Sequence, residues 1–181
     1  MTVLHFKVAD AIVDREMIVR INIEYMEWVA TGMEASCGVS IVAVSGQSIA
    51  DYVEGSVDKV CAEKPPRGIF YLLRQDDEVI GMVGLRSLCD DVAEIKRLYV
   101  REAFRGQHVG TMLLNKVIGD AKAFGYARVR LDSAPFMKAA QQLYRSAGFV
   151  DRAPYSGTEV PLVLQAQWHF MELNFPDQKC T

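Results

Sequence analysis

The sequence lacks several patterns that would assign the protein to a specialised class. Its four cysteines, Cys37, Cys61, Cys89 and Cys180, are scattered without a CxxC pair, which argues against a zinc site or a disulfide framework. No apolar run reaches the ~20 residues that a membrane helix needs, and the N-terminal stretch has no basic leader. We therefore expect an unprocessed cytoplasmic protein with free thiols, no bound metal and no contact with a membrane.

The charge balance also excludes a class of partner. With 20 basic and 23 acidic residues the formal net charge is −3, and the basic residues do not gather in one stretch. A nucleic-acid-binding protein would need a clustered basic face, so we expect no nucleic acid partner. There is no internal repeat or low-complexity tract. A chain of 181 residues that is 50% hydrophobic is long enough for one well-cored domain, and we expect a single domain over residues 1–181.

The most informative stretch is Ala93 to Gly110, AEIKRLYVREAFRGQHVG. Its first eight residues have the β-branched and aromatic content of a strand. From Val109 to Phe124 apolar residues recur every three or four positions, which predicts a helix with one buried face. The amides of the connecting turn, Arg105 to Gly110, have no acceptor within the first helical turn and can bind an anion such as a diphosphate. The alternative is an ordinary strand-to-helix turn that uses glycine for geometry alone.

The pattern elsewhere predicts an α/β protein with a sheet of mixed direction and helices on both faces. The N-terminal half should form a strand at residues 2–8, a helix from Asp10 to Trp28, a loop over residues 31–48, a helix over 49–62 and a strand hairpin at 69–74 and 79–88. The C-terminal half should form a strand at 127–132, a helix that begins at Ser133 and Pro135 and ends at Gly148, strands at 149–152 and 167–174, and a loop over 153–165.

Two blocks carry a resemblance to the GNAT superfamily of acyl-CoA-dependent N-acetyltransferases. The first is the turn from Arg105 to Gly110, which resembles the superfamily's pyrophosphate loop, and the second is residues 139–149, AAQQLYRSAGF. Together, and in this order, they are more specific than either alone. The resemblance implies a twisted, mostly antiparallel sheet with helices on both faces. It also implies acetyl-CoA as cosubstrate and a primary amine as acceptor.

The resemblance assigns coenzyme binding to the end of the strand, the turn and the later helix. These residues are Leu98, Tyr99, Val100, Arg105, Gly106, Gln107, His108, Val109, Gly110, Thr111, Ser133, Met137, Ala140 and Tyr144. His108 stands where the superfamily usually has glycine. We expect it to adopt helical backbone angles, which any L-residue tolerates, and to face solvent; the alternative is a protonated imidazole that helps to bind a phosphate. The N–H of Val100 would hold the oxyanion that forms on the acetyl carbonyl.

Two residues are catalytic candidates by the same resemblance. Tyr144 would protonate the departing thiolate as general acid; from periodicity alone it is a core tyrosine. Glu94 would activate the amine, directly or through water; beside Lys96 and Arg97 it is equally a paired surface charge.

The acceptor cannot be identified from the sequence beyond a small-molecule or peptide amine. Five residues either line its pocket or belong to the core: Met26, Trp28, Met33, Tyr155 and Trp168. Other possibilities are a transferase for a different acyl chain and an acyl-CoA binding module that has lost transfer. The resemblance also suggests a homodimer.

Overall fold

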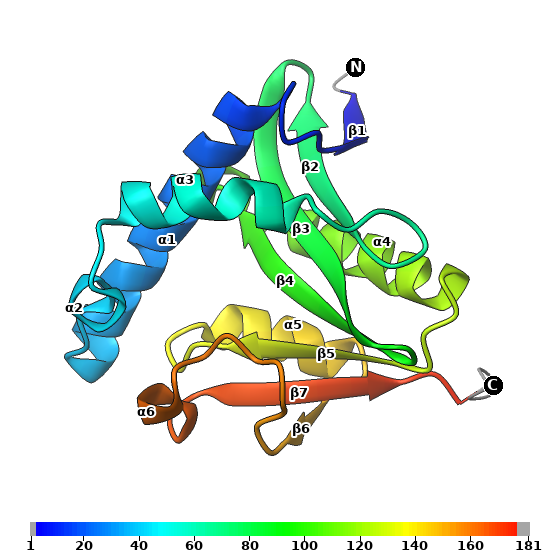
Figure 1. The fold of residues 1–181 in the computed structure, drawn as a ribbon. Helices are drawn as coiled ribbons and strands as arrows, with labels where there is room; N and C mark the ends of the chain where they lie inside the picture. The colour runs from blue at the N-terminus through cyan, green and yellow to red at the C-terminus, as the bar shows by residue number, and fades with distance from the viewer. Residues whose placement is uncertain (1–2, 177–181) are drawn as a thin grey trace.

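The computed structural model describes residues 3–176, which form a seven-stranded sheet in the order β1-β2-β3-β4-β5-β7-β6 (Figure 1). The strands are β1 (Leu4–Val8), β2 (Ile69–Gln75), β3 (Glu78–Cys89), β4 (Val92–Val100), β5 (Arg128–Ser133), β6 (Val150–Arg152) and β7 (His169–Asn174). Thr2 of the predicted first strand and Cys180 lie outside the described residues. Within residues 3–176 no helix combines the length and apolarity needed to cross a membrane.

The sheet is antiparallel except between β4 and β5, so the predicted fold class is confirmed. The parallel contact is short, since it joins only residues 92–94 to residues 128–130. Beyond Glu94 the two strands diverge, and Figure 1 shows the wedge between them. This opening in the middle of the sheet exposes backbone groups of β4 that would otherwise be paired.

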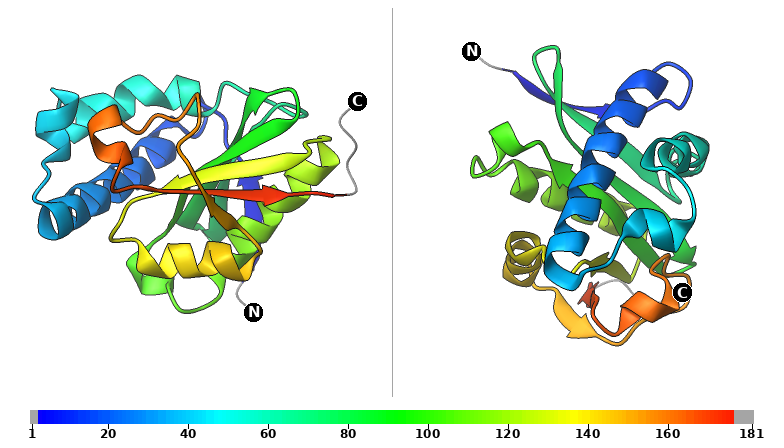
Figure 2. Two further views of the ribbon diagram at one scale, coloured as in Figure 1. Left: turned by 90° about the horizontal axis from the view of Figure 1, so that it is seen from below. Right: turned by 90° about the vertical axis from the view of Figure 1, so that its left-hand side faces the viewer.

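Helices cover both faces of the sheet, as Figure 2 shows. One face carries α1 (Arg15–Cys37), α2 (Ile41–Ser45) and α3 (Ile49–Val60), and the other carries α4 (Val109–Ala123) and α5 (Lys138–Ser146). Alternate residues of β2 serve the two faces, because side chains of a strand point to opposite sides. Leu73 packs in the cluster that contains Leu113 of α4, while Leu72 packs in the cluster that contains Ile18 of α1.

The first helix differs from the prediction at both ends. It begins at Arg15 because Asp10 caps a preceding turn instead, accepting hydrogen bonds from the amides of Ile12 (2.8 Å) and Val13 (3.0 Å). It then continues to Cys37, and α2 follows, so the predicted loop over residues 31–48 is wrong. The loop was predicted because residues 31–48 are rich in glycine and serine. Gly32 of this segment lies inside the helix, where an added Cβ would sit 2.4 Å from the ring of Phe136. That glycine permits close packing and does not end the helix.

The predicted start of the later helix is also wrong. Ser133 is the last residue of β5, and α5 begins at Lys138 after Met137, with no side-chain cap. The Ser133 hydroxyl is buried and has no hydrogen-bond partner among the described residues, so it does not cap α5, which begins five residues later. The predicted end is confirmed, because Gly148 follows the helix with a φ of 95°. Two short elements fall in predicted connections: η1 (Glu102–Phe104) and α6 (Leu162–Gln165).

Candidate functional site

The turn before α4 presents a run of free backbone donors. Among residues 3–176, the N–H groups of residues 106–111 find no protein acceptor; the first amide of the helix that does is Met112, which donates to the carbonyl oxygen of His108 at 3.0 Å. Six consecutive free amides at the positive end of a 15-residue helix form a strong anion site. The turn itself is exposed, so a ligand can reach these donors.

His108 occupies a backbone conformation that the sequence did not predict. Its φ of 61° and ψ of 8° are left-handed, so the expectation of helical angles is wrong. This conformation costs a residue with a Cβ roughly 1–2 kcal/mol, whereas glycine adopts it freely. Gly106 has a φ of 75°, so the turn has two left-handed positions and only one glycine to fill them.

A groove of about 440 Å³ runs from this turn between the end of β4 and the start of α5. It brings together most of the predicted coenzyme residues: Leu98, Tyr99, Val100, Arg105, Gly106, His108, Val109, Gly110, Thr111, Met137 and Ala140. Trp28, a predicted acceptor residue, lines this groove and not the acceptor side. Three predicted residues, Gln107, Ser133 and Tyr144, are not part of its wall.

Arg105 and Lys138 are the cationic side chains of the groove, and Arg105 lies in the turn itself. Its Nε donates to the carbonyl oxygen of Val100 at 3.0 Å, and its guanidinium lies 4.9 Å from the ring of Trp28 and 5.7 Å from that of Tyr99. Within residues 3–176 it forms no ion pair. The guanidinium is therefore held in place by a carbonyl and two rings while its charge is left available to a phosphate.

The backbone of Val100 faces the wedge between β4 and β5. The next residue, Arg101, donates its amide to Ile80 of β3 at 2.9 Å. Because neighbouring residues of an antiparallel strand direct their backbone groups to opposite sides, the N–H of Val100 points away from β3. The carbonyl of Val100 also points away from β3, since it accepts a hydrogen bond from the side chain of Arg105. The predicted oxyanion donor thus points into open space.

Tyr144 lies between this groove and a second cavity. The residue is 6% exposed, and its ring packs 6.0 Å from that of Phe149. Burial raises the pKa of its hydroxyl, and the nearby Tyr25 and Asp132 raise it further. Those two residues line the second cavity, while Ala140 of the same helix lines the groove. Among the described residues its hydroxyl has no hydrogen-bond partner.

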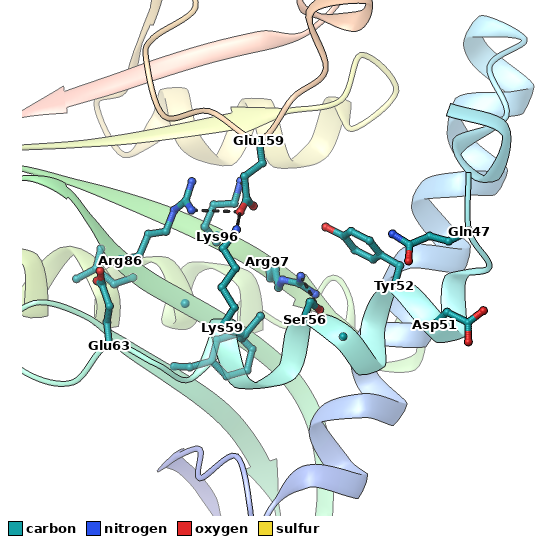
Figure 3. Close-up of a pocket in the computed structure, with 15 residues that line it drawn as sticks. Gln47, Asp51, Tyr52, Ser56, Lys59, Glu63, Arg86, Lys96, Arg97 and Glu159 are labelled. Atoms are coloured by element: carbon teal, nitrogen blue, oxygen red, sulfur yellow. Dashed lines mark hydrogen bonds and ion pairs between the residues drawn. The ribbon is translucent and has the colours of Figure 1, made fainter. Parts of the chain in front are cut away.

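The second cavity has two lobes of about 320 and 240 Å³, which share Tyr52, Lys96, Arg97 and Glu159. Figure 3 shows the polar lobe, where side chains of β3, β4, α3 and the loop before α6 converge. The other lobe is mainly apolar and includes the predicted Met26 and Trp168. The remaining predicted acceptor residues, Met33 and Tyr155, are core residues.

Glu94 is fully buried behind this cavity and does not line it. Its carboxylate accepts from Arg86 Nε at 2.5 Å and from the Tyr155 hydroxyl at 2.7 Å. Burial raises the pKa of Glu94, although the charges of Lys96 and Arg86 oppose that shift. The pairing that the sequence allowed is present, but it lies inside the protein and not on its surface.

The cavity wall contains a carboxylate that sequence reasoning missed. Asp132, at the point where β5 leaves β4, accepts from Lys96 Nζ at 3.1 Å and from Trp168 Nε1 at 3.0 Å. Arg97 was missed as well, although Lys96 and Arg97 break the strand's alternation of apolar and polar residues, and that break is a signal for a bulge.

Known proteins resemble the chain in sequence and in fold. A family model described as Acetyltransferase (GNAT) family matches residues 43–149. An uncharacterized N-acetyltransferase of Schizosaccharomyces pombe is 32% identical over 55% of this chain and 63% of its own length. An IAA acetyltransferase of Azospirillum brasilense is 34% identical over 48% of this chain and 57% of its own length. The human N-acetylaspartate synthetase is 34% identical over 48% of this chain and 29% of its own length. The matched region is thus less than two thirds of each relative.

Solved structures share the whole architecture at low identity. The PaiA N-acetyltransferase of Thermoplasma acidophilum, in complex with coenzyme A, superposes with a TM-score of 0.71 at 17% identity, covering 96% of this chain and 99% of that one. An acetyltransferase of Streptococcus agalactiae gives a TM-score of 0.68 at 16% identity, covering 95% and 98%. These similarities extend the match in fold to almost the full chain.

Proposed function

The chain belongs to the GNAT family of acetyltransferases, and from this premise we propose that it transfers the acetyl group of acetyl-CoA to a primary amine. The observation that carries the proposal is the run of free amides at residues 106–111, which among residues 3–176 find no protein acceptor and lie at the end of the groove between β4 and α5. A diphosphate fits the amides and Arg105, and the groove accommodates the arm that carries the acetyl group.

The proposed transfer is a direct attack within a ternary complex. The amine nitrogen forms a bond to the acetyl carbonyl carbon, the carbon–sulfur bond breaks, and the thiolate takes a proton. The N–H of Val100 faces the place where negative charge develops on the carbonyl oxygen, and Tyr144, kept protonated by burial, donates to the sulfur. Among the described cysteines, Cys37, Cys61 and Cys89, none lines the groove or the cavity, which favours a mechanism without an acyl-enzyme.

Two carboxylates are candidates for the proton that the amine loses. Asp132 lines the cavity beside Tyr144, whereas Glu94 lies behind Lys96 and Arg86 and can act only through water or through those side chains. Direct contact is the simpler route. We therefore place the amine at Asp132 and treat Glu94 as the more distant candidate.

The relatives do not fix the acceptor. One is named as an IAA acetyltransferase and another as an N-acetylaspartate synthetase, so their names differ in what is acetylated or made. For this chain we propose a small amine, because the apolar lobe measures only about 240 Å³. A peptide amine would have to enter by its terminus alone.

The location and assembly are also proposals. The described cysteines are free, which supports a reducing cytoplasm. A homodimer could form through β6, the edge strand, whose Val150 is 59% exposed. Light scattering of the purified protein would determine the mass in solution.

Release of free thiol from acetyl-CoA over a panel of amines tests the transfer. We expect release with at least one amine and formation of its N-acetyl product by mass spectrometry. An acyl-CoA binding module would bind CoA in calorimetry and release no thiol with any amine, and that result would overturn the proposal. Repeating the panel with propionyl-CoA tests the choice of acyl chain.

A further inference from the structure

Arg97 has a strained backbone at the edge of the second cavity. Its φ of 55° is rare for a residue with a long side chain, and it coincides with a shift of register between β3 and β4. Strain of this kind persists where the surrounding structure enforces it, and it concentrates at functional sites. The bulge lets both Lys96 and Arg97 line the same cavity, which strict alternation along a strand would prevent.

The guanidinium of Arg97 is held by neutral groups only. It donates to Asn22 Oδ1 at 2.5 Å and to Ser56 Oγ at 3.2 Å, and it lies 6.0 Å from the ring of Tyr52. No ion pair of Arg97 exists within residues 3–176. Figure 3 shows it rising from β4 toward Ser56 and Tyr52 of α3.

The other cations around this cavity are paired with carboxylates. Lys59, Arg86 and Lys96 lie 2.5, 3.2 and 3.5 Å from the carboxylate of Glu159. Arg86 also pairs with Glu94 and Lys96 with Asp132, so three carboxylates balance three cations. That carboxylate comes from the loop before α6 and shows that an anion is well accommodated here. Among the described residues, Arg97 therefore remains on the cavity wall as a positive charge without a counter-ion.

The apolar lobe of the second cavity indicates which other chemical group the ligand has. It is lined largely by apolar side chains: Met26, Val29, Ile41, Val160, Leu164 and Trp168. A small apolar group would fill this lobe and be stabilised there by its removal from water. The cavity thus combines the Arg97 cation, an apolar wall and the carboxylate of Asp132, whose oxygens each accept one hydrogen bond, from Lys96 and Trp168, and each keep a lone pair for an amine.

We propose that the acceptor is an amino acid with an apolar side chain, whose carboxylate binds Arg97 while its amine lies at Asp132. The inference rests on the proposed transfer and specifies its substrate class. The planar guanidinium matches a carboxylate with two parallel hydrogen bonds. A polyamine, by contrast, would bring a second positive charge against Arg97.

The first test changes the substrate and leaves the protein intact. Thiol release is measured with L-leucine, L-leucinamide and spermidine at equal concentrations of free amine. We expect kcat/KM for L-leucine to exceed that for L-leucinamide on the order of 10- to 100-fold, the range for a hydrogen-bonded charge pair. Equal values for the acid and the amide, or a preference for spermidine, would overturn the carboxylate site while leaving the transferase proposal intact.

The second test changes Arg97. Arg97→Gln should raise KM for L-leucine on the order of 10- to 100-fold more than KM for L-leucinamide, so that the preference for the acid is lost. Arg67→Gln is the matched control, because Arg67 is an exposed arginine outside the cavity whose side chain reaches only Ser87 Oγ at 3.4 Å. Equal losses for acid and amide would show that Arg97 has only a structural role.

Failure of the transfer can be separated from failure of the carboxylate site. If no amine releases thiol, the transferase proposal falls, and calorimetry of L-leucine against L-leucinamide with the CoA-bound protein still decides the site. Tighter binding of the acid would support it and equal binding would overturn it. If Arg97→Gln does not fold, the substrate comparison on the unchanged protein decides alone.

Discussion

Arg97 and His108 have left-handed backbone conformations, with φ values of 55° and 61°. Arg97 lines the second cavity and His108 lines the groove before α4. Neither conformation follows from the residue type, because both side chains favour negative φ. The cost of these conformations must be offset by packing elsewhere in the fold, which suggests that position 108 is not optimised for stability.

His108→Gly should therefore raise stability and preserve coenzyme binding. The change relieves roughly 1–2 kcal/mol of left-handed strain, against which glycine loses roughly 0.5–1 kcal/mol of chain entropy. We expect a melting temperature equal to or above that of the parent and a CoA affinity at least as high. Gly106→Ala, at a φ of 75°, is the reverse change and should destabilise. A large loss of CoA affinity in His108→Gly would show that the imidazole contacts the ligand.

Tyr144→Phe should lower kcat and kcat/KM together, on the order of 10²-fold or more, because it removes a proton donor that acts in the transition state. Stability should change little: the hydroxyl has no hydrogen-bond partner among residues 3–176, and the ring packing against Phe149 is kept. Steady-state kinetics and a melting curve measure both effects. An unchanged kcat in a folded Tyr144→Phe protein would remove the general-acid role.

The two carboxylates should respond differently to neutralisation. Asp132→Asn should flatten the base-type limb of the pH–rate profile, since Asp132 lines the cavity. Glu94→Gln should mainly lower stability, because it leaves Arg86 without its buried partner. Rates across pH and denaturant unfolding separate these outcomes. If Glu94→Gln displaces the base-type limb of the pH–rate profile and Asp132→Asn does not, then Glu94 is the base.

At the scale of elements, sequence reasoning was most reliable where local physics decides. The 3.6-residue spacing of apolar residues and the glycines predicted α4 and its turn, and six amides prove to be free there. The extension of α1 was missed because Gly32 suggested a loop, while its actual constraint is the ring of Phe136, more than 100 positions away. Contacts at that separation leave no local signal.

Gly110→Glu should abolish CoA binding while the fold persists. The position lies in the groove wall, where an added Cβ would meet Leu143 at 3.3 Å, and a carboxylate there would repel a diphosphate. Gly119→Glu is the matched control, since Gly119 is an exposed glycine of the same helix with open space around it. Calorimetry with CoA gives the result. Equal affinities for the two variants would place the diphosphate elsewhere.

At the scale of the whole molecule, the acceptor cavity joins segments that are far apart in the chain. Asn22 of α1, Ser56 of α3, Arg97 of β4 and Glu159 of the late loop meet there. Tyr144 and Glu94 could be named as catalytic candidates from their positions in the sequence motifs. The contacts around the cavity, by contrast, depend on how the helices pack on the sheet. The residues that the family resemblance assigns to coenzyme binding lie mainly in two short blocks, so they could be proposed from the sequence without knowledge of these contacts, and most of them line one groove.

The loop that carries Glu159 should be fastened to the rest of the molecule in a pH-dependent way. Burial alone would raise the pKa of Glu159, but a hydrogen bond from Lys59 and the charges of Lys96 and Arg86 lower it to about 2. A carboxyl whose pKa is lower in the folded state stabilises the fold above its unfolded pKa, and this contribution is lost as pH falls through the folded value. The free energy of unfolding should therefore drop between about pH 4.5 and pH 2.

Glu159→Gln tests this link between the loop and the sheet. The variant should have a lower free energy of unfolding than the parent at pH 7. This difference, the stability gap, should close as pH falls from about 4.5 toward 2, because the Glu159 carboxylate of the parent then becomes protonated and loses its charge. The gap should also shrink in high salt, since Glu159 is partly exposed and its ion pairs are screened. Urea unfolding at pH 7, 4 and 3 measures the gap. A gap that stays constant across these pH values would mean that the carboxylate's charge does not hold the loop.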